Sequence, residues 1–292
     1  MAFVYNYIGR PTTALDLMNT IRDYLISAGW TLLREYTDGS GNAFKFLQTA
    51  PYIMPDNSNA GSAVLELRNP ATTNHVDVRM WTSWNSATNS PVAPNCPDDA
   101  NGSYLRLAYS YQSGVFYWLY ANEYWFALLA SGAGASPNTD AIYHTIVGIA
   151  LPPQGIPTAP PYKALFVAAP YNTGGSLIDG GYGVRLIIHD GYRGVLVAIN
   201  PSNGAIFWWN WLRQDDSRRI PSVYIGHPDI PVLTYPLLLW RAGEIKYARI
   251  TGNQFFGMGT RIPIGSETWV PIIQGSSSIG WSGVGQIWAR IQ

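Results

Sequence analysis

The sequence has a single cysteine and few charged residues, and both shortages exclude classes of protein. Cys96 is the only cysteine among 292 residues, so neither a disulfide framework within the chain nor a cysteine-based zinc site can form. Charged residues make up 12% of the chain, against a usual share of about 25%. The 18 basic residues balance the 18 acidic ones, and no basic run is longer than Arg218-Arg219. Because a nucleic-acid-binding protein needs a positive field, we expect no nucleic-acid partner.

Long apolar segments are also missing. No apolar run reaches the roughly 18 residues that a membrane-spanning helix needs, so no membrane insertion is expected. The first ten residues contain no basic segment followed by an apolar one, so no signal peptide is expected either. The sequence therefore predicts a protein that is made and folded in a cytosol.

Aromatic and turn-forming residues, in contrast, are abundant. The chain contains 12 Trp, 19 Tyr, 29 Gly and 21 Pro. Low charge combined with many aromatic residues excludes a disordered chain, and the length allows a substantial core. A polar surface built mostly from uncharged residues does not resist association by charge repulsion. Such a surface is typical of a protein that is held in an assembly, or of a protein that binds sugar.

Three consecutive apolar segments are predicted to form the centre of the fold. The first two, Val115–Tyr120 and Tyr124–Ala130, are joined by Ala121-Asn122-Glu123, which suits a hairpin turn with the asparagine in a strained conformation. Apolar residues at successive positions predict that both faces of these strands are covered. The third segment, Ile142–Leu151, is rich in β-branched residues and ends at Pro152-Pro153, which cannot continue a ladder of hydrogen bonds.

One amphipathic helix is predicted, over Thr13–Ala28. Thr13 and Asp16 resemble a capping box at its start, and Gly29 is expected to end it. Its apolar stripe is expected to consist of Leu15, Met18, Ile21, Leu25 and Ala28. Because the helix is short and apolar on one side only, it should pack on a sheet.

The rest of the chain reads as short strands separated by turn residues, at a spacing of about ten residues, which predicts an antiparallel sandwich or barrel. The expected strands are Phe3–Ile8 (a strand or an arm), Trp30–Tyr36, Ala43–Gln48, Ser62–Arg68, Asp77–Thr82, Tyr104–Ser110, Leu165–Ala168, Val184–Ile188, Gly194–Ile199, Ala205–Trp211, Tyr235–Arg241, Glu244–Ile250, Thr268–Ile273 and Gly285–Ile291. Trp84–Gly102 is expected to be a long polar loop.

The predicted fold class is therefore mainly β, with one N-terminal helix packed on a sheet. The Pro-rich stretch Pro152–Pro161 is either a linker between two domains or a connection across the surface of one domain. We favour the second alternative, a single continuous unit over residues 1–292.

Histidine and aspartate pairs are weak candidates for chemistry. His189-Asp190-Gly191 fits a turn better than an acid–base pair, because adjacent strand residues point to opposite faces. His227-Pro228-Asp229 offers two metal-type ligands, as do His75 and Asp77. A metal site needs three or four converging groups, so a structural role is favoured for both pairs.

Motifs of hydrolases and nucleotide-binding proteins are incomplete. Gly280-Trp281-Ser282-Gly283 lacks the spacing of a serine nucleophile, and the glycine pairs around Ser176–Asp179 lack the lysine of a phosphate-binding loop. Glu123 and Glu267 lie beside aromatic residues and could sit near a sugar. A glycan hydrolase, however, needs two carboxylates about 5 to 10 Å apart. We predict no catalytic residue, no cofactor, no metal and no enzymatic activity.

The tryptophans admit three interpretations. Trp81 and Trp84 form one group, and Trp208, Trp209 and Trp211 form another. They could pack in the core, anchor an interface between subunits or stack on sugar rings.

The order of the elements resembles a known group of proteins. The segments that carry the resemblance are Ala28–Arg34, the Asp-Gly turn with Phe44–Leu47, Tyr117–Phe126, Ile142–Leu151 with its Pro-Pro, Ala242–Ile250, Gly265–Pro271 and Ile287–Ile291. This layout resembles tailed-bacteriophage virion proteins described as structural or tail proteins, and the likeness covers most of the chain.

The resemblance implies a capsid, connector, tail or baseplate component that is present in several copies of a virion. Its partners would be other virion proteins and copies of itself, and no catalytic residues are carried over. The alternative is a receptor-binding tail component whose partner is a host surface glycan. A glycan hydrolase is the third hypothesis.

Overall fold

The computed structural model describes residues 2–9, 11–53, 59–73, 75–96, 105–108, 116–131, 141–150, 164–169, 183–188, 197–198, 234–239, 243–251, 260–273 and 287–292. Within these residues the chain forms one α-helix and a set of antiparallel strands. The mainly β fold class with one N-terminal helix is therefore confirmed. The predicted strand Ala205–Trp211 and the Pro-rich stretch Pro152–Pro161 lie outside the described residues.

Helix α1 spans Ala14–Ser27, as the capping residues predict. The N-cap is Thr13, whose Oγ1 accepts a hydrogen bond from the Asp16 N–H at 3.0 Å. At the other end Gly29 has φ +100°, and the N–H of Trp30 donates to the carbonyl of Leu25 at 3.0 Å. This is a Schellman motif, in which only glycine takes the left-handed conformation without strain.

One member of the expected apolar stripe of α1 is wrong. Leu15 is 42% exposed, and Leu17 is buried in its place. At about 100° per residue, Leu17 lies about 40° from Ile21 around the helix axis, within the buried face, whereas Leu15 lies about 120° from Ile21, at the rim of that face.

The central sheet has seven strands, and all neighbouring strands in it are antiparallel. Its order is β1 (Val4–Gly9), β10 (Phe116–Ala121), β11 (Trp125–Ser131), β12 (Ala141–Ala150), β13 (Ala164–Ala169), β14 (Gly183–Ile188) and β15 (Val197–Ala198). The predicted hairpin and the third apolar strand are thus confirmed as β10, β11 and β12.

Two further sheets are formed by residues on either side of the central hairpin. The N-terminal sheet runs β2 (Thr31–Thr37), β3 (Ala43–Gln48), β6 (Val64–Asn69), β7 (His75–Asn85) and β8 (Ser90–Cys96), with β9 (Leu105–Ala108) beside β7. The C-terminal sheet runs β16 (Thr234–Leu239), β17 (Gly243–Thr251), β20 (Ile287–Arg290), β19 (Glu267–Ile273) and β18 (Ile262–Ile264). The short strands β4 (Tyr52–Ile53) and β5 (Asn59–Gly61) pair with each other.

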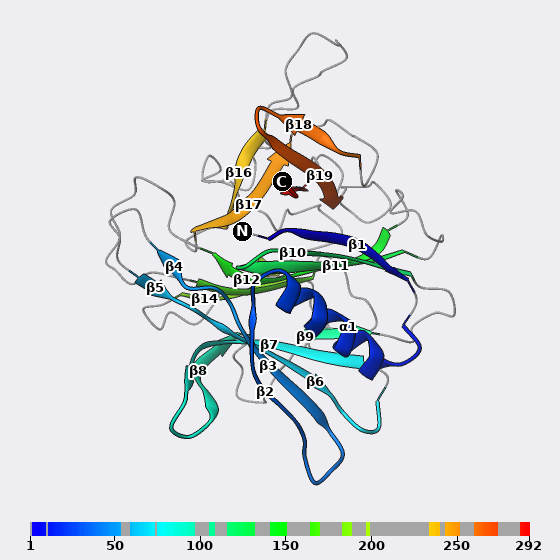
Figure 1. Ribbon diagram of the computed structural model, residues 1–292, viewed down its shortest axis with the longest axis vertical. Coiled ribbons are helices and arrows are strands. Elements are labelled where there is room, and N and C mark those ends of the chain that lie inside the picture. Colours follow the sequence, from blue (N-terminus) through cyan, green and yellow to red (C-terminus); the bar gives the residue numbers. More distant parts are fainter. Residues whose placement is uncertain are drawn as a thin grey trace.

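The sheets are stacked in layers (Figure 1). The C-terminal sheet covers one face of the central sheet, through contacts of β17 with β12 and of β19 with β11. On the other face, α1 lies between β10 and the strands β3, β6 and β7, while β13 contacts β7, β8 and β9 directly. Consecutive residues of the central strands are accordingly buried, such as Trp125, Phe126 and Ala127, each 0% exposed. Coverage of both faces is confirmed.

The expected long polar loop Trp84–Gly102 is wrong. The strand β7 continues to Asn85, and after a turn the chain returns as β8 (Ser90–Cys96). This strand was not predicted because it contains two prolines, Pro91 and Pro94, which argue against a strand. They are tolerated because β8 is at the edge of its sheet as far as the described residues show, so that one side of its backbone has no neighbouring strand in that part of the chain.

Candidate functional site

Several of the sequence candidates lie outside the described residues. They are the pairs at His189 and His227, the serine motif at Ser282, the glycine pairs around Ser176–Asp179, and the tryptophans Trp208, Trp209 and Trp211.

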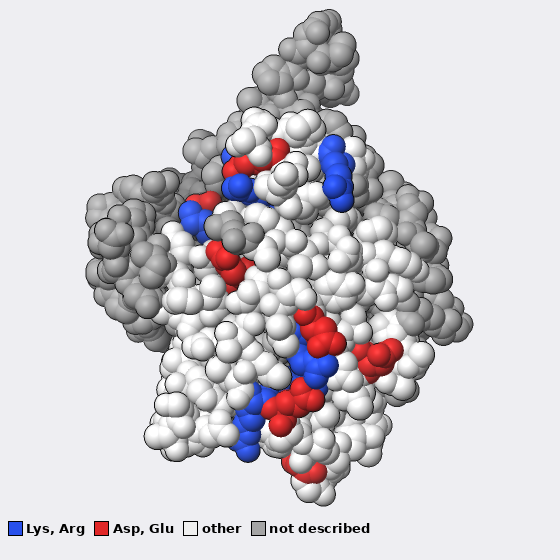
Figure 2. Space-filling view, viewed as in Figure 1, with Lys and Arg blue, Asp and Glu red and all other residues white. Residues whose placement is uncertain are grey.

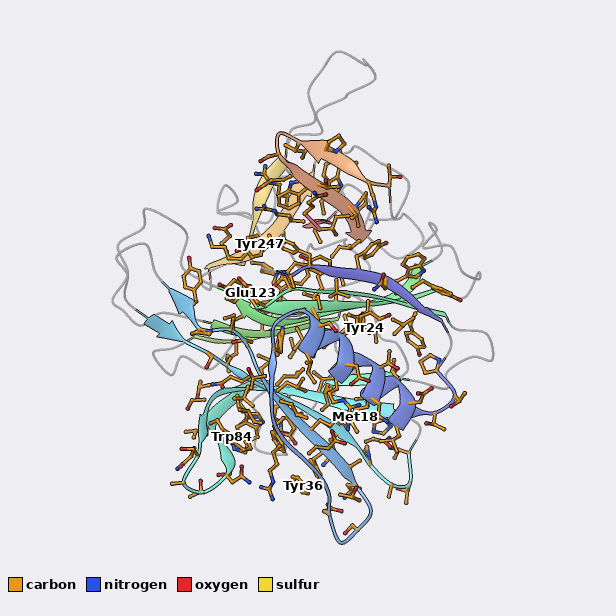
Figure 3. The ribbon with its side chains drawn as sticks, in the orientation of Figure 1. Met18, Tyr24, Tyr36, Trp84, Glu123 and Tyr247 are labelled. Carbon is orange, nitrogen blue, oxygen red and sulfur yellow. The ribbon has the colours of Figure 1, made fainter. Side chains whose placement is uncertain are left out.

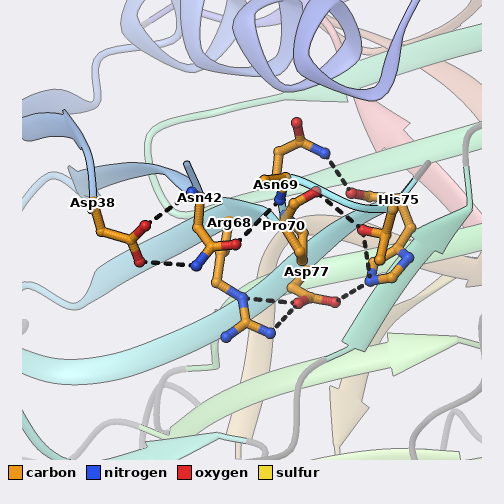
Figure 4. A network of polar contacts seen from close by, with 9 residues as sticks. Asp38, Asn42, Arg68, Asn69, Pro70, His75 and Asp77 are labelled. Atoms are coloured by element: carbon orange, nitrogen blue, oxygen red, sulfur yellow. Dashed lines mark hydrogen bonds and ion pairs between the residues drawn. The ribbon is translucent and has the colours of Figure 1, made fainter. Parts of the chain in front are cut away.

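His75 and Asp77 do meet, in a partly buried polar network (Figure 4). They are two residues apart on β7 and therefore share a face, with their Nε2 and Oδ1 atoms 3.1 Å apart. Arg68, directly opposite on β6, donates from Nε to Asp77 Oδ2 at 2.9 Å. Asp77 is 0% exposed, so these partners compensate the burial of its charge. No group of three or more His, Cys, Asp or Glu side chains suited to a metal ion occurs among the described residues.

The two glutamates considered for sugar chemistry have different surroundings. Glu267 accepts a hydrogen bond from the indole N–H of Trp269 at 3.1 Å and forms an ion pair with Arg290. Glu123 lies close to Tyr247 where the central and C-terminal sheets meet (Figure 3). The structure thus gives Glu267 a place in an ion pair on the C-terminal sheet and Glu123 a place at a junction between layers.

Of the two tryptophan groups considered above, Trp81 and Trp84 are described, and they pack within the N-terminal sheet. The Trp81 N–H donates to Glu66 Oε2 at 2.7 Å, and the guanidinium of Arg79 lies over its ring. Trp84 packs on Phe46, with ring centroids 5.3 Å apart. For these two residues the contacts favour the packing interpretation over sugar stacking.

An aromatic ladder extends from Phe46 across β3 and β2. The rings of Tyr36 and Phe44 are 5.0 Å apart and nearly parallel, and Phe46 is parallel to both. The guanidinium of Arg34 lies 4.2 Å from the Tyr36 centroid. Because the stacking partners come from the chain itself, this ladder stabilises the β2–β3 hairpin.

The turn between β10 and β11 joins several layers through Asn122. Its Oδ1 accepts hydrogen bonds from the N–H groups of Tyr124 (2.8 Å) and Trp125 (3.1 Å), and its amide donates to the hydroxyl of Tyr120 at 3.0 Å. Its carbonyl accepts from the indole N–H of Trp30 at 2.6 Å. The expected strained backbone at Asn122 is wrong: among described residues other than glycine, only Asn89 and Tyr247 have positive φ.

The same turn is connected to the C-terminal sheet. The Tyr120 hydroxyl donates to the carbonyl of Arg290 at 2.9 Å, and the Trp125 indole donates to the carbonyl of Lys246 at 2.5 Å. Burial raises the pKa of the Tyr120 phenol above its ordinary value, so the hydroxyl stays a donor at neutral pH.

Tyr247 occupies a strained position beside this turn. Its φ of +62° is unusual for a bulky residue, and it falls where β17 bulges against β16. The conformation directs its ring toward Phe3 (5.2 Å, edge-on) and Tyr124 (6.1 Å, stacked). Burial, with the nearby Glu123 carboxylate as a second cause, raises the pKa of Tyr247 to about 12. The strained backbone thus holds the C-terminal sheet against the central hairpin.

A pocket of about 350 Å³ opens between α1 and the β2–β3 hairpin. It is lined by Leu15, Asn19, Glu35, Tyr36, Thr37, Ala43, Phe44 and Lys45. These residues come together because the hairpin extends past the N-terminal half of α1, which buries its other face on the sheet. The sequence pattern did not predict this pocket, because a leucine is usually buried and a lysine usually exposed. Here Leu15 is exposed and Lys45 is buried.

An ion-pair network forms the polar wall of this pocket. Glu35 accepts from Lys45 Nζ at 2.7 Å and from Arg22 Nη1 at 2.8 Å, and Arg22 also contacts Asp23 at 2.7 Å. The hydrogen bond from Lys45 is the main cause that lowers the pKa of Glu35, and burial lowers the pKa of Lys45. Figure 2 shows one of the groups of charged side chains of this face over the region of α1 and the hairpin.

Comparison of the sequence with protein-family models gives no match, and comparison with curated proteins gives none. In the part of the chain that the structure describes, no helix is both long and apolar enough to cross a membrane. A functional assignment therefore depends on the geometry of the strands and the pocket.

Proposed function

We propose that this protein is a structural component of a tailed-bacteriophage virion, in its tail, baseplate or connector region, and acts through protein–protein contacts in a symmetric assembly. The resemblance in element order suggests this role. The observation that supports it most directly is the edge of the central sheet at β1, which among the described residues pairs on one side only.

Edge strands are usually protected against pairing with other chains by prolines, charges or shortness. The other edges of the three large sheets have such protection: Pro91 and Pro94 in β8, Pro236 in β16, Pro263 in β18, Arg34 and Glu35 in β2, a length of four residues in β9 and of two residues in β15. Strand β1, with the sequence VYNYIG, has neither a proline nor a charged residue. It pairs on one side with β10, and its Tyr7 is 37% exposed.

Addition of a strand from a neighbouring subunit to β1 would continue the central sheet from one protein to the next. A virion component needs repeated contacts of this kind, and the low charge of the chain does not oppose them. The proposed partners are accordingly copies of this chain and other virion proteins, and the proposed location is the virion.

The test is the mass of the purified chain, from light scattering after gel filtration over a range of concentrations. A discrete multimer of about 3, 6 or 12 chains is expected from cyclic symmetry. Asn6→Lys with Tyr7→Lys should shift it to monomer, since both residues are exposed on β1. The matched control Thr31→Lys, on the edge strand β2, should leave the multimer intact. A wild-type chain that is monomeric at every concentration would contradict self-assembly.

A second role, binding of a host surface glycan by a receptor-binding tail component, is favoured by one specific observation. The pocket beside α1 combines hydrogen-bonding groups with apolar surface in the way that ligand pockets do. Its chemistry determines which ligand it would accept.

A further inference from the structure

The pocket between α1 and the β2–β3 hairpin has little net charge. The two residues with charged side chains in its lining are Glu35 and Lys45, and they neutralise each other. Arg22 and Asp23, which extend the network, do the same. A strongly anionic or cationic ligand therefore gains no net attraction here.

Hydrogen-bonding capacity, however, is left over in the wall of the pocket. The Lys45 side chain is 3% exposed, and its ammonium group carries three N–H donors. Glu35 accepts from this group, and no second acceptor for it is found among the described residues. A nearly buried ammonium group with unused donors is costly unless an oxygen from solvent or a ligand completes its shell.

Glu35 provides acceptors next to those donors. Its side chain is 42% exposed, and its two oxygens can accept more hydrogen bonds than the two that Lys45 and Arg22 donate. The Asn19 amide and the Thr37 hydroxyl add groups that both donate and accept, and Leu15, 42% exposed, adds an apolar surface.

From this arrangement we infer that the pocket is a binding site for a neutral polyhydroxylated ligand, namely a sugar residue of a glycan. Adjacent hydroxyl groups can accept from Lys45 and donate to Glu35 at the same time, which an ammonium ion cannot do because it has no acceptor. A phosphate anion would place its negative charge beside the Glu35 carboxylate, whereas a neutral hydroxyl group does not. The apolar C–H face of a sugar ring would lie on Leu15. The volume is near the lower end of the range of about 300 to 1,000 Å³ for ligand pockets, which suits a small ligand. This inference rests on the second of the two proposed roles.

The experiment is saturation-transfer NMR on the full chain, with the methyl glycosides of glucose, galactose, mannose and N-acetylglucosamine as probes. Inorganic phosphate and tetramethylammonium serve as anionic and cationic probes. We expect saturable binding of at least one glycoside and stronger binding of it than of either ion.

The variants Asn19→Ala and Thr37→Val remove groups from the pocket at positions that are not buried, so the fold should persist. Each should weaken glycoside binding at least about fivefold, the effect of one lost hydrogen bond. Thr31→Val, an exposed threonine of the same strand outside the lining, is the matched control and should bind as the wild type does.

Absence of saturable glycoside binding by the folded wild-type chain would overturn the inference, and so would equal binding by Thr37→Val and Thr31→Val, or a preference for phosphate. The result is independent of assembly. A monomer that binds a glycoside would retain this inference and contradict the proposed assembly, whereas a multimer that binds no glycoside would do the reverse.

Discussion

The buried side chain of Asn122 connects several hydrogen-bonding groups at the turn between β10 and β11. It is 0% exposed, and its side chain serves two backbone N–H groups and one hydroxyl group. The sequence predicted the turn and its asparagine but assigned the residue a strained backbone. The reason for an asparagine is instead its side-chain hydrogen bonds, which join residues two and three positions away. Only the bond from Trp30 to its backbone carbonyl comes from a distant part of the sequence.

We expect Asn122→Ala to lower the free energy of unfolding by about 2 to 4 kcal/mol, because it leaves buried donors without partners. Asn85→Ala is the matched control. The Oδ1 of Asn85 also accepts from two backbone N–H groups, of Ala87 and Thr88, but on an exposed turn where water can replace it. Its cost should stay below about 1 kcal/mol. Urea denaturation of the two variants measures the difference, and equal costs would contradict the role of burial.

The Glu35–Lys45 pair predicts a dependence of stability on acid. The pKa of Glu35 lies below its ordinary value of 4.5 in the folded chain, chiefly because Lys45 donates to it. Its contribution to stability is therefore complete above that value and is lost as the pH falls through the lower folded pKa. Since Glu35 is 42% exposed, screening limits the effect to about 0.2 to 1 kcal/mol.

The measurement is urea denaturation of the wild type and of Glu35→Gln between about pH 6 and pH 3. The wild type should lose its advantage over Glu35→Gln as the pH decreases. A constant difference in free energy of unfolding across this range would contradict the prediction.

At the scale of elements, sequence patterns worked best where the signal is local. The capping residues and the apolar periodicity of α1 predicted where the helix begins and ends, because an N-cap and a Schellman motif involve residues within one turn of the helix. Edge strand β8 was missed, because its prolines are acceptable only at an edge, and the position of an edge is a property of the whole sheet.

Gly148 predicts how tightly β11 and β12 approach each other. It lies opposite Trp125, and a Cβ atom at this position would be 2.3 Å from the Trp125 Cβ and 2.5 Å from the Tyr124 carbonyl oxygen. Backbone atoms cannot give way as a flexible side chain can, so Gly148→Ala should cost more than about 2 kcal/mol. Gly39→Ala, at an open position, should cost little. Thermal unfolding of both variants tests the difference, and similar melting temperatures would contradict the close approach.

At the scale of the whole molecule, the layers share one buried cluster. Its members extend from Ala14 to Ala289 and include residues of all three large sheets. The Tyr120 hydroxyl connects the central sheet to the carbonyl of Arg290, across 170 positions of the chain. The single continuous unit over residues 1–292 remains a prediction, and this link offers a test of it.

We expect Tyr120→Phe to lower the free energy of unfolding by about 1 to 2 kcal/mol, since it removes a buried hydrogen bond between layers. In a single unit, the loss of strand signal in far-ultraviolet circular dichroism and of tryptophan signal in fluorescence should still coincide. Two separate transitions in the wild type would instead indicate two domains.

The sequence by itself determined the class of the fold, the helix and most strand positions, because these follow from capping residues, turns and periodicity within a few neighbouring residues. Only the tertiary structure decided which strands became neighbours. Strand β1 pairs with β10 more than a hundred residues away, and this pairing leaves β1 as an edge. The pocket beside α1 likewise exists only once the helix lies against β2 and β3. Such pairings depend on burial and hydrogen bonding between residues that are far apart in the sequence, and short sequence patterns cannot predict them.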